Sequence, residues 1–204
     1  MKNIAHIGEG TIIGAEQRPL LIDRNFQNYT IEDNSSFGEN VWIGSLCVVG
    51  KKVKFKDNVI LSDGSFVEDN VNIGNNTILV YKCLVCANVT IGDNCIIGGF
   101  IGESTSIGNN CRIFGDIVHK HTDPSKDWDA PTSMEQGAII QDNVFIGFGA
   151  KITKPVTIGH NVYILPNTIV SQEIPPYNIV KGINEIIHYK DWKGELSVSD
   201  FFTN

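Results

Sequence analysis

The sequence predicts an all-β protein, a solenoid of short parallel strands, and two regularities support this prediction. Large apolar residues recur in steps of six along most of the chain, and asparagine or glycine recurs at fixed places within the steps. A helix would need a period of about 3.6 residues, so a period of six kept over this length excludes a helical repeat. We therefore expect stacked short strands that are separated by tight turns.

The first position of each six-residue unit holds a large apolar residue. The main series consists of Ile31, Phe37, Ile43, Val49, Phe55, Leu61, Val67, Ile73, Leu79, Val85, Ile91 and Ile97. After a slip of two residues the series continues at Ile101, Ile107 and Ile113, and it resumes from Ile140 to Val170. An isolated unit begins at Ile7. Side chains alternate between the two faces of a strand, so these residues are expected to fill one common interior.

The fourth and fifth positions are also patterned. The fourth is very often asparagine, which like glycine tolerates a positive φ angle, so we expect one left-handed turn per unit. The fifth is small or β-branched and has the same parity as the first, so it also points inward. Cys47, Cys83, Cys95 and Cys111 occupy this place. The Cys83/Cys86 pair, which alone would suggest redox or zinc chemistry, is therefore interpreted as core packing.

Composition limits the functional classes. The chain has 204 residues, of which 42% are hydrophobic and 19% charged, as in one soluble globular domain. Its formal net charge of −7 argues against a nucleic-acid or membrane-surface partner. It has no apolar run approaching the ~18 residues of a membrane span. The start "MKNIAHIGEG" lacks the apolar core of a signal peptide, so a cytoplasmic location is expected.

Two segments leave the repeat, and we expect both to be loops extruded from the solenoid. They cover about residues 15–30 and 119–137. A solenoid does not need such loops for its stability, so they usually serve function. The predicted solenoid domain covers residues 1–183, and residues 184–204 form a C-terminal tail.

His119 and His121 stand where the second interruption begins, and the chain has only 5 histidines. The six-residue period would place His119 at the next inward position after Ile113, with His121 two residues beyond it. A neutral imidazole whose pKa lies near neutrality can act as a general base. The period alone does not choose between the two.

Three units, "IGDNCI", "IGNNCR" and "IGHNVY", resemble the hexapeptide repeat of left-handed parallel β-helix proteins, in which three units form one triangular coil. The segment "DNVFIGFGAKI" resembles "NVWIGxGAxI" of the hexapeptide acetyltransferases, the family of maltose, galactoside, xenobiotic and sugar O- and N-acetyltransferases. The run "VSQEIPPYNIVKGI" is similar to their "VTKDIPPxxIVxGNPAK" ending. Gln172 replaces the usual lysine and "INEII" replaces "NPAK", so the basic residues that meet the coenzyme phosphates are altered.

This resemblance implies a left-handed parallel β-helix that transfers an acetyl group from acetyl-CoA to a hydroxyl or amine of a small acceptor. The acceptor would be a sugar or a nucleotide-linked amino sugar. His121 matches the family's catalytic histidine, and His119 is the alternative if the loop length differs. The resemblance also implies a homotrimer with sites between subunits and no metal.

The same resemblance assigns further residues. Those expected along the acetyl-CoA groove are Phe148, Gly149, Ala150, Lys151, Pro166, Ser171 and Lys181. Those expected to position the acceptor or the base are Asp116, Asp123, Trp128 and Tyr29, the aromatic ones by stacking on a sugar ring.

Two other functions remain open for this fold. One is a non-catalytic scaffold, which the altered C-terminal motif leaves possible. The other is a metal enzyme of the γ-carbonic-anhydrase type, which needs three histidines around a zinc-like ion, two of them five residues apart. His119 and His121 are two residues apart, and His6, His160 and His188 do not restore that spacing.

Overall fold

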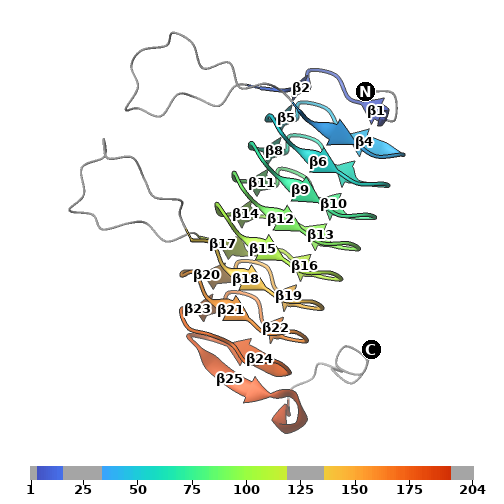
Figure 1. Ribbon diagram of the computed structural model, residues 1–204. Helices are drawn as coiled ribbons and strands as arrows, with labels where there is room; N and C mark the ends of the chain where they lie inside the picture. The colour runs from blue at the N-terminus through green and yellow to red at the C-terminus, as the bar shows by residue number, and fades with distance from the viewer. Residues whose placement is uncertain (1–3, 16–33, 119–135, 194–204) are drawn as a thin grey trace, which may run out of the picture.

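The computed structural model describes residues 4–15, 34–118 and 136–193, and they form a parallel β-helix (Figure 1). Three sheets, here called A, B and C, run the length of the molecule. Successive strands along the chain fall on A, then B, then C, and each strand pairs in parallel with the strand one coil further on. This confirms the parallel β-helix predicted from the repeat, and it agrees with the left-handed coil that the resemblance implies.

The strands are short. Sheet A contains, in spatial order, β1 (Ile4–Ile7), β4 (Val41–Ile43), β7 (Ile60–Leu61), β10 (Ile78–Leu79), β13 (Ile96–Ile97), β16 (Arg112–Ile113), β19 (Phe145–Ile146), β22 (Tyr163–Ile164), β24 (Asn178–Lys181) and β25 (Glu185–His188). Sheet B contains β2 (Ile12–Ile13), β5 (Val48–Val49), β8 (Phe66–Val67), β11 (Leu84–Val85), β14 (Phe100–Ile101), β17 (Asp116–Ile117), β20 (Lys151–Ile152) and β23 (Ile169–Val170). Sheet C contains β3 (Ser36–Phe37), β6 (Lys54–Phe55), β9 (Asn72–Ile73), β12 (Thr90–Ile91), β15 (Ser106–Ile107), β18 (Ile139–Ile140) and β21 (Thr157–Ile158).

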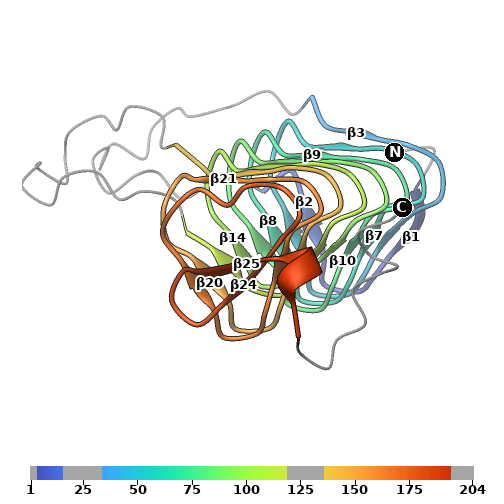
Figure 2. The same ribbon diagram turned by 90° about the horizontal axis from the view of Figure 1, so that it is seen from below.

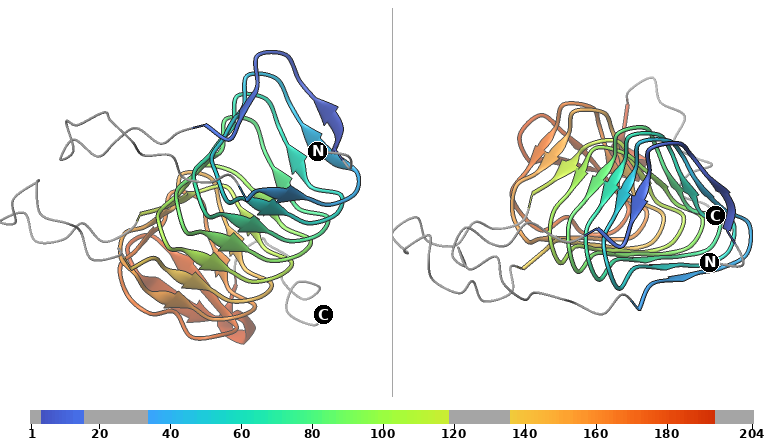
Figure 3. Two further views of the ribbon diagram at one scale, coloured as in Figure 1. Left: turned by 45° about the horizontal axis from the view of Figure 1, so that its top comes forward. Right: turned by 90° about the horizontal axis from the view of Figure 1, so that it is seen from above.

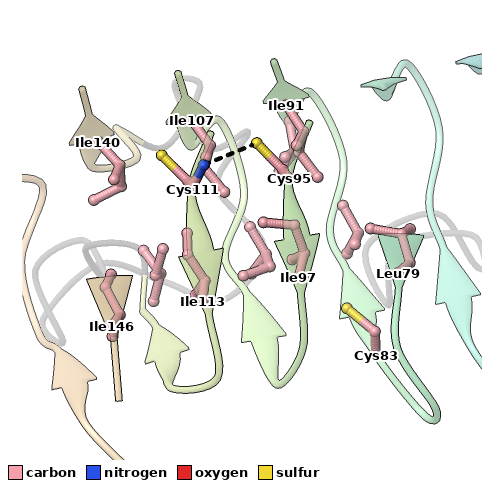
Figure 4. Close-up of a cluster of buried hydrophobic side chains, with 14 of the residues drawn as sticks. Leu79, Cys83, Ile91, Cys95, Ile97, Ile107, Cys111, Ile113, Ile140 and Ile146 are labelled. Carbon is pink, nitrogen blue, oxygen red and sulfur yellow. Dashed lines mark hydrogen bonds between the residues drawn. The ribbon is translucent and has the colours of Figure 1, made fainter. Parts of the chain in front are cut away.

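The interior is filled as the repeat predicts. From Ile43 to Val170 every described first-position residue is buried, and the fifth-position residues lie beside them. Figure 4 shows part of this interior, with labelled residues from Leu79 to Ile146. Phe37, near the first coils, is only partly buried, and Ile7 in β1 is 43% exposed, because few coils cover that end. Each coil buries its inner face against its neighbours, as is typical of solenoids. Figures 2 and 3 show how the coils stack along one axis.

The corners between sheets are tight left-handed turns. Ten fourth-position asparagines have φ between 54° and 61°, and most of them lie at the corner between sheets C and A. At this C–A corner the carboxamide Nδ2 of one asparagine donates to Oδ1 of the next, as from Asn40 to Asn58 (3.2 Å) and from Asn58 to Asn76 (3.0 Å). Each such step joins residues 18 positions apart, which is the length of one regular coil. The asparagines therefore both form the turns and join the coils.

The inward cysteines hydrogen-bond as well as pack. The thiols of Cys47, Cys95 and Cys111 each donate to a backbone carbonyl of the next coil at 3.2 Å. The Thr77 hydroxyl makes the equivalent bond to the Gly92 carbonyl at 2.9 Å. Cys83 is 1% exposed, and burial raises the pKa of its thiol to about 12. The structure thus confirms the packing interpretation of Cys83, and it adds a donor role at the other three positions.

The expectation that His119 takes the next inward position is wrong. Ile117 occupies that place: it is fully buried in β17 and pairs with Ile101. The A–B corner is two residues shorter here, because only Phe114 and Gly115 join β16 to β17. The same shortening one coil earlier, at Gly98 and Gly99, accounts for the slip in the sequence series. The period is therefore broken before the histidines, and not by them.

Both interruptions of the repeat leave the solenoid at the same corner. The first follows β2 and the second follows β17, both in sheet B, and the chain returns before β3 and β18, both in sheet C. Extra residues at the B–C corner leave the stacking of all three sheets intact. Both interruptions therefore begin and end at the B–C corner of the solenoid.

The C-terminal end of the helix is closed by a hairpin. β25 turns back and pairs antiparallel with β24, with Ile179 opposite Ile187, and a short 3₁₀ turn (Tyr189–Asp191) follows. Ile186 packs against the core. The segment predicted as a tail from residue 184 thus begins with a strand that covers the last coil. No helix among the described residues has the length and apolarity that a membrane crossing requires.

Candidate functional site

The residues predicted to bind acetyl-CoA gather on one part of the surface. Phe148 and Gly149 form the A–B corner after β19, and Pro166 forms the same corner one coil further on. Lys181 is the last residue of β24, again next to this corner, while Lys151 and Ser171 lie in or directly after strands of sheet B. The structure therefore brings these residues together on the A–B corner and the adjoining face of sheet B.

Two shortened turns precede Phe148 on the A–B corner. They are Gly98–Gly99 and Phe114–Gly115, on the two coils that precede the coil of Phe148. A Cβ on Gly99 would lie 2.5 Å from the Gly115 carbonyl oxygen, and one on Gly115 would lie 2.4 Å from the Ala150 carbonyl oxygen. Glycine is therefore required for these turns to stack. The turn that contains Phe148 has the length found in the regular coils, whereas the corresponding turn on each of the two preceding coils is two residues shorter.

Phe148 belongs to a cluster of aromatic rings. It is 69% exposed and stacks on Phe114, with ring centroids 4.7 Å apart and an interplanar angle of 16°. Phe114 also contacts Phe145, and Phe145 meets Tyr163 edge to face at 4.8 Å. The cluster extends from the A–B corner onto the outer face of sheet A. A flat exposed ring of this kind can stack on a planar or apolar ligand group.

The packing of the coils explains why glycine and alanine occupy positions 149 and 150. Gly149 has φ +69°, and a Cβ there would lie 2.3 Å from the Asn167 carboxamide oxygen. The Ala150 side chain is fully buried, its N–H donates to the Gly147 carbonyl (3.2 Å) and its carbonyl accepts from the Asp116 N–H (2.8 Å). Coil packing alone therefore accounts for both residues.

Asp116 and Lys151, predicted for different roles, form an ion pair. They are direct neighbours on β17 and β20, and Lys151 Nζ lies 2.8 Å from Asp116 Oδ2. The other oxygen, Oδ1, accepts from the Phe100 backbone N–H (3.2 Å). The pair lies on the outer face of sheet B, on the strand from which the chain leaves the coil after Val118. It is thus a fixed polar group at the base of the second interruption.

The side chains of Ser171 and Lys181 already have partners within the chain. The Ser171 backbone N–H donates to Asn184 Oδ1 (2.8 Å), and the Asn184 Nδ2 donates to the Ser171 hydroxyl (2.9 Å). Lys181 Nζ pairs with Glu185 at 3.0 Å. A coenzyme phosphate would have to compete with the carboxylate for Lys181. Lys154, at the next B–C corner, is exposed and makes no side-chain hydrogen bond or ion pair within the described part of the chain.

The remaining predicted residues lie outside the described residues. These are His119, His121, Asp123, Trp128 and Tyr29. Among the other histidines, His6 stacks on Trp42 in the first coil and His188 belongs to β25. In residues 4–15, 34–118 and 136–193, no three His, Cys, Asp or Glu side chains come together in a group that could hold a metal ion.

Sequence reasoning missed two residues of this surface, Phe114 and Tyr163, and one residue beside it, Arg112. Phe114 and Tyr163 complete the aromatic cluster, and Arg112 is in register with Phe145 on the outer face of sheet A. A signal was present for Phe114, since it occupies a second position of the unit, where glycine is common. The stacking partner Phe148 could not be assigned to it, because the interruption between them hides the register.

Residues 137–172 match the family model described as bacterial transferase hexapeptide (six repeats), which confirms the repeat recognised in the sequence. This segment begins where the chain returns to the coil and contains Phe148, Gly149, Lys151, Pro166 and Ser171. The hexapeptide repeat of bacterial transferases is therefore present in the same part of the chain as the predicted groove.

Serine acetyltransferases are among the curated relatives. The chain is 34% identical over 87 residues to serine acetyltransferase of Staphylococcus aureus strain Mu50, covering 43% of this chain and 38% of the relative. It is 36% identical over 87 residues to serine acetyltransferase of Staphylococcus epidermidis strain ATCC 35984, with the same coverage. The chain thus spans well under half the length of the curated relatives it matches.

A solved structure with the same fold is a UDP-N-acetylglucosamine acyltransferase from Bacteroides fragilis. It is 17% identical, has a TM-score of 0.53, and is matched over 78% of this chain and 71% of its own. At that identity the likeness shows the shared fold.

Proposed function

We propose that this protein is an acyltransferase that moves an acetyl group from acetyl-CoA to a hydroxyl or amine of a small acceptor, a sugar or nucleotide-linked amino sugar. The proposal rests on the fact that the family match and the predicted coenzyme groove fall in the same segment of the chain. The segment that matches the transferase hexapeptide model, residues 137–172, contains most of the residues predicted to line the coenzyme groove. The serine acetyltransferase relatives support the same type of reaction.

In the proposed mechanism His121 is the general base. Its neutral imidazole takes the proton from the acceptor O–H or N–H while that oxygen or nitrogen attacks the thioester carbonyl carbon. The tetrahedral intermediate then expels the coenzyme thiolate, which takes up the proton from the imidazolium. No metal and no covalent enzyme intermediate are required. The sequence resemblance supports His121 for this role, and His119 is the alternative.

The donor would lie along the A–B corner. Its pantetheine arm would pass the exposed ring of Phe148 and the turns at Gly149 and Pro166. Ala150 would contribute only through the backbone that shapes the turn, since its side chain points into the core. Lys151 and Lys181 are already paired with carboxylates, so phosphate binding requires that one of these pairs open or that Lys154 serve instead.

We also propose that the active form is a homotrimer with its sites between subunits. The exposed large hydrophobic residues support self-association, since all except Ile139 lie on sheet A, sheet B or near the corner between them. The outward residues of sheet C are mostly Ser, Lys, Asn and Thr. A subunit contact over sheets A and B would lie next to Phe148.

The test is an acetyl-transfer assay that follows the released coenzyme thiol over a panel of sugars and amino-sugar nucleotides. We expect His121→Ala to lower the rate by at least about 10²-fold, as loss of a general base does, and His119→Ala to leave substantial activity. Sedimentation of each variant checks that assembly is unchanged. Equal losses in both variants would contradict the assignment, and the reverse pattern would move the role to His119.

A non-catalytic scaffold is the second candidate, favoured by the occupied state of Ser171 and Lys181. Acetyl-CoA binding separates the two candidates, because a scaffold has no reason to bind the coenzyme.

A further inference from the structure

A polar groove of about 1040 Å³ lies on the C–A corner, away from the A–B corner on which the predicted coenzyme residues gather. Its walls come from four successive coils. The corner asparagines contribute one carboxamide per coil, and the residues concerned are Asn94, Asn110, Asn143 and Asn161. Neighbouring coils are roughly 4.8 Å apart, so the groove is long enough for several units of an extended ligand.

The asparagine ladder is interrupted at this groove. Asn76 Nδ2 still donates to Asn94 Oδ1 (3.2 Å), and Asn143 Nδ2 donates to Asn161 Oδ1. Within the residues that the structure describes, Asn94 Nδ2 and the whole Asn110 carboxamide make no side-chain hydrogen bond. The backbone ladder of this corner continues through the same place, with the Asn110 N–H donating to the Asp93 carbonyl (2.9 Å) and the Asn143 N–H to the Asn109 carbonyl (2.8 Å). Only the side-chain ladder is therefore interrupted.

Arg112 supplies a positive charge beside these free amides. It lines the groove from the first residue of β16, is exposed, and has no hydrogen bond or ion pair at its guanidinium in the described part of the chain. Asp142 is the one carboxylate of the lining, and its Oδ1 accepts from the Asn109 backbone N–H (2.6 Å) and from Asn109 Nδ2 (3.3 Å). The guanidinium therefore keeps its five N–H donors for a ligand.

His160 and Gln141 extend the donor set. The Gln141 Oε1 accepts from the His160 backbone N–H (2.9 Å), which leaves the Gln141 amide N–H groups available. His160 Nδ1 lies 3.3 Å from Asn161 Nδ2, and when it accepts from that group the ring carries its proton on Nε2. The groove is thus rich in donors and has few free acceptors.

We infer that this groove binds an acidic oligosaccharide, with a carboxylate on Arg112 and sugar hydroxyls on Asn94 Nδ2 and the Asn110 carboxamide. A planar guanidinium matches a carboxylate bidentately, which favours an anionic group at that place. The Asn110 carboxamide can both donate to and accept from a ring hydroxyl, Asn94 Nδ2 can donate to one, and their places on neighbouring coils suit adjacent rings. This inference concerns binding alone and does not depend on acetyl transfer.

The test is a calorimetric titration with trigalacturonic acid, in the absence of acetyl-CoA. Neutral maltotriose, free galacturonic acid and inorganic phosphate serve as comparison ligands. We expect saturable binding of the acidic trisaccharide that weakens at high salt, and a loss of at least about tenfold in Arg112→Gln. Asn110→Gly, which keeps the left-handed turn but removes the carboxamide, should also weaken binding.

The matched control is Lys54→Gln, which removes one exposed positive charge from sheet C two coils before Asn94. It should bind as the wild type does. Unchanged binding in Arg112→Gln, equally tight binding of maltotriose, or no binding at roughly 10 mM ligand would each overturn the inference. Equal affinity for inorganic phosphate or for the free monosaccharide would show a simple anion site and overturn the oligosaccharide assignment.

Discussion

At the scale of single residues, the structure favours glycine at position 149 for two separate reasons. Its φ of +69° favours glycine, and an added Cβ would lie 2.3 Å from the Asn167 carboxamide oxygen. Gly64 lies on the same corner with φ +68°, but a Cβ there would meet only Lys82 Cγ at 3.5 Å. The two positions therefore separate backbone strain from steric clash.

We predict that Gly64→Ala lowers the free energy of unfolding by roughly 1–2 kcal/mol, the cost of a left-handed backbone for a residue with a Cβ. Gly149→Ala should cost about 1 kcal/mol more, because Asn167 must also move. Guanidinium unfolding followed by circular dichroism measures both. Equal losses would show that the Asn167 side chain turns away freely.

A second residue-scale prediction concerns Cys83 and pH. Burial raises the pKa of its thiol from 9.0 to about 12, so the folded protein holds this proton more tightly than the unfolded chain. The stability that the neutral thiol contributes is fully present below pH 9 and is lost as the pH rises from 9 through 12. Cys83→Ala should flatten the decline in unfolding free energy over that window.

Cys86→Ala is the control for this experiment, since it removes another buried thiol from the adjacent unit. The test therefore compares how the unfolding free energy changes with pH in wild type, Cys83→Ala and Cys86→Ala. Identical pH profiles for wild type and Cys83→Ala would contradict the assignment.

At the scale of elements, β25 closes the C-terminal end of the solenoid. Ile186 packs against the core, whereas its neighbour Ile187 is not among the core-packing residues. We predict that Ile186→Ser lowers the unfolding free energy by roughly 1–3 kcal/mol through lost burial, and that Ile187→Ser costs less. Thermal unfolding of the two variants measures the difference, and equal effects would mean that the strand does not act as a cap.

The elements also show what the sequence could predict. Positions such as Ile43 and Ile146 were predictable, because the period fixes the parity of a strand and parity fixes its inward face. The register across irregular coils was not. Regular coils join residues 18 apart, but the joined pairs Asp93 and Asn109 lie 16 apart, and Asp116 and Lys151 lie 35 apart.

The changed register across irregular coils explains why the six-residue period wrongly placed His119 at an inward position. Two apolar residues, Ile113 and Ile117, are four positions apart, and nothing in a six-residue template shows that the turn between them is shortened. The same effect hid the Asp116–Lys151 pair, the Phe114–Phe148 stack and the polar groove at the C–A corner. Each joins residues whose separation depends on an interruption of the repeat.

At the scale of the whole molecule, the three outer faces differ. Sheets A and B carry exposed apolar residues such as Ile60 and Phe66, whereas sheet C carries polar ones such as Thr90. We predict that the double variant Ile60→Lys/Phe66→Lys lowers the sedimenting mass toward that of a monomer, because the charges cannot be buried unpaired between subunits. Thr90→Lys should leave assembly unchanged. A double variant that still assembles would place the contact elsewhere.

The most direct test of the proposed function is a calorimetric titration of acetyl-CoA into the wild type, Phe148→Ala and Tyr81→Ala. Tyr81 is also exposed on the A–B corner, at 63%, but lies before the two shortened turns. We predict saturation near one coenzyme per chain, clearly weaker binding in Phe148→Ala, and unchanged binding in Tyr81→Ala. An absence of binding at millimolar coenzyme, or wild-type affinity in Phe148→Ala, would contradict a donor groove at this corner.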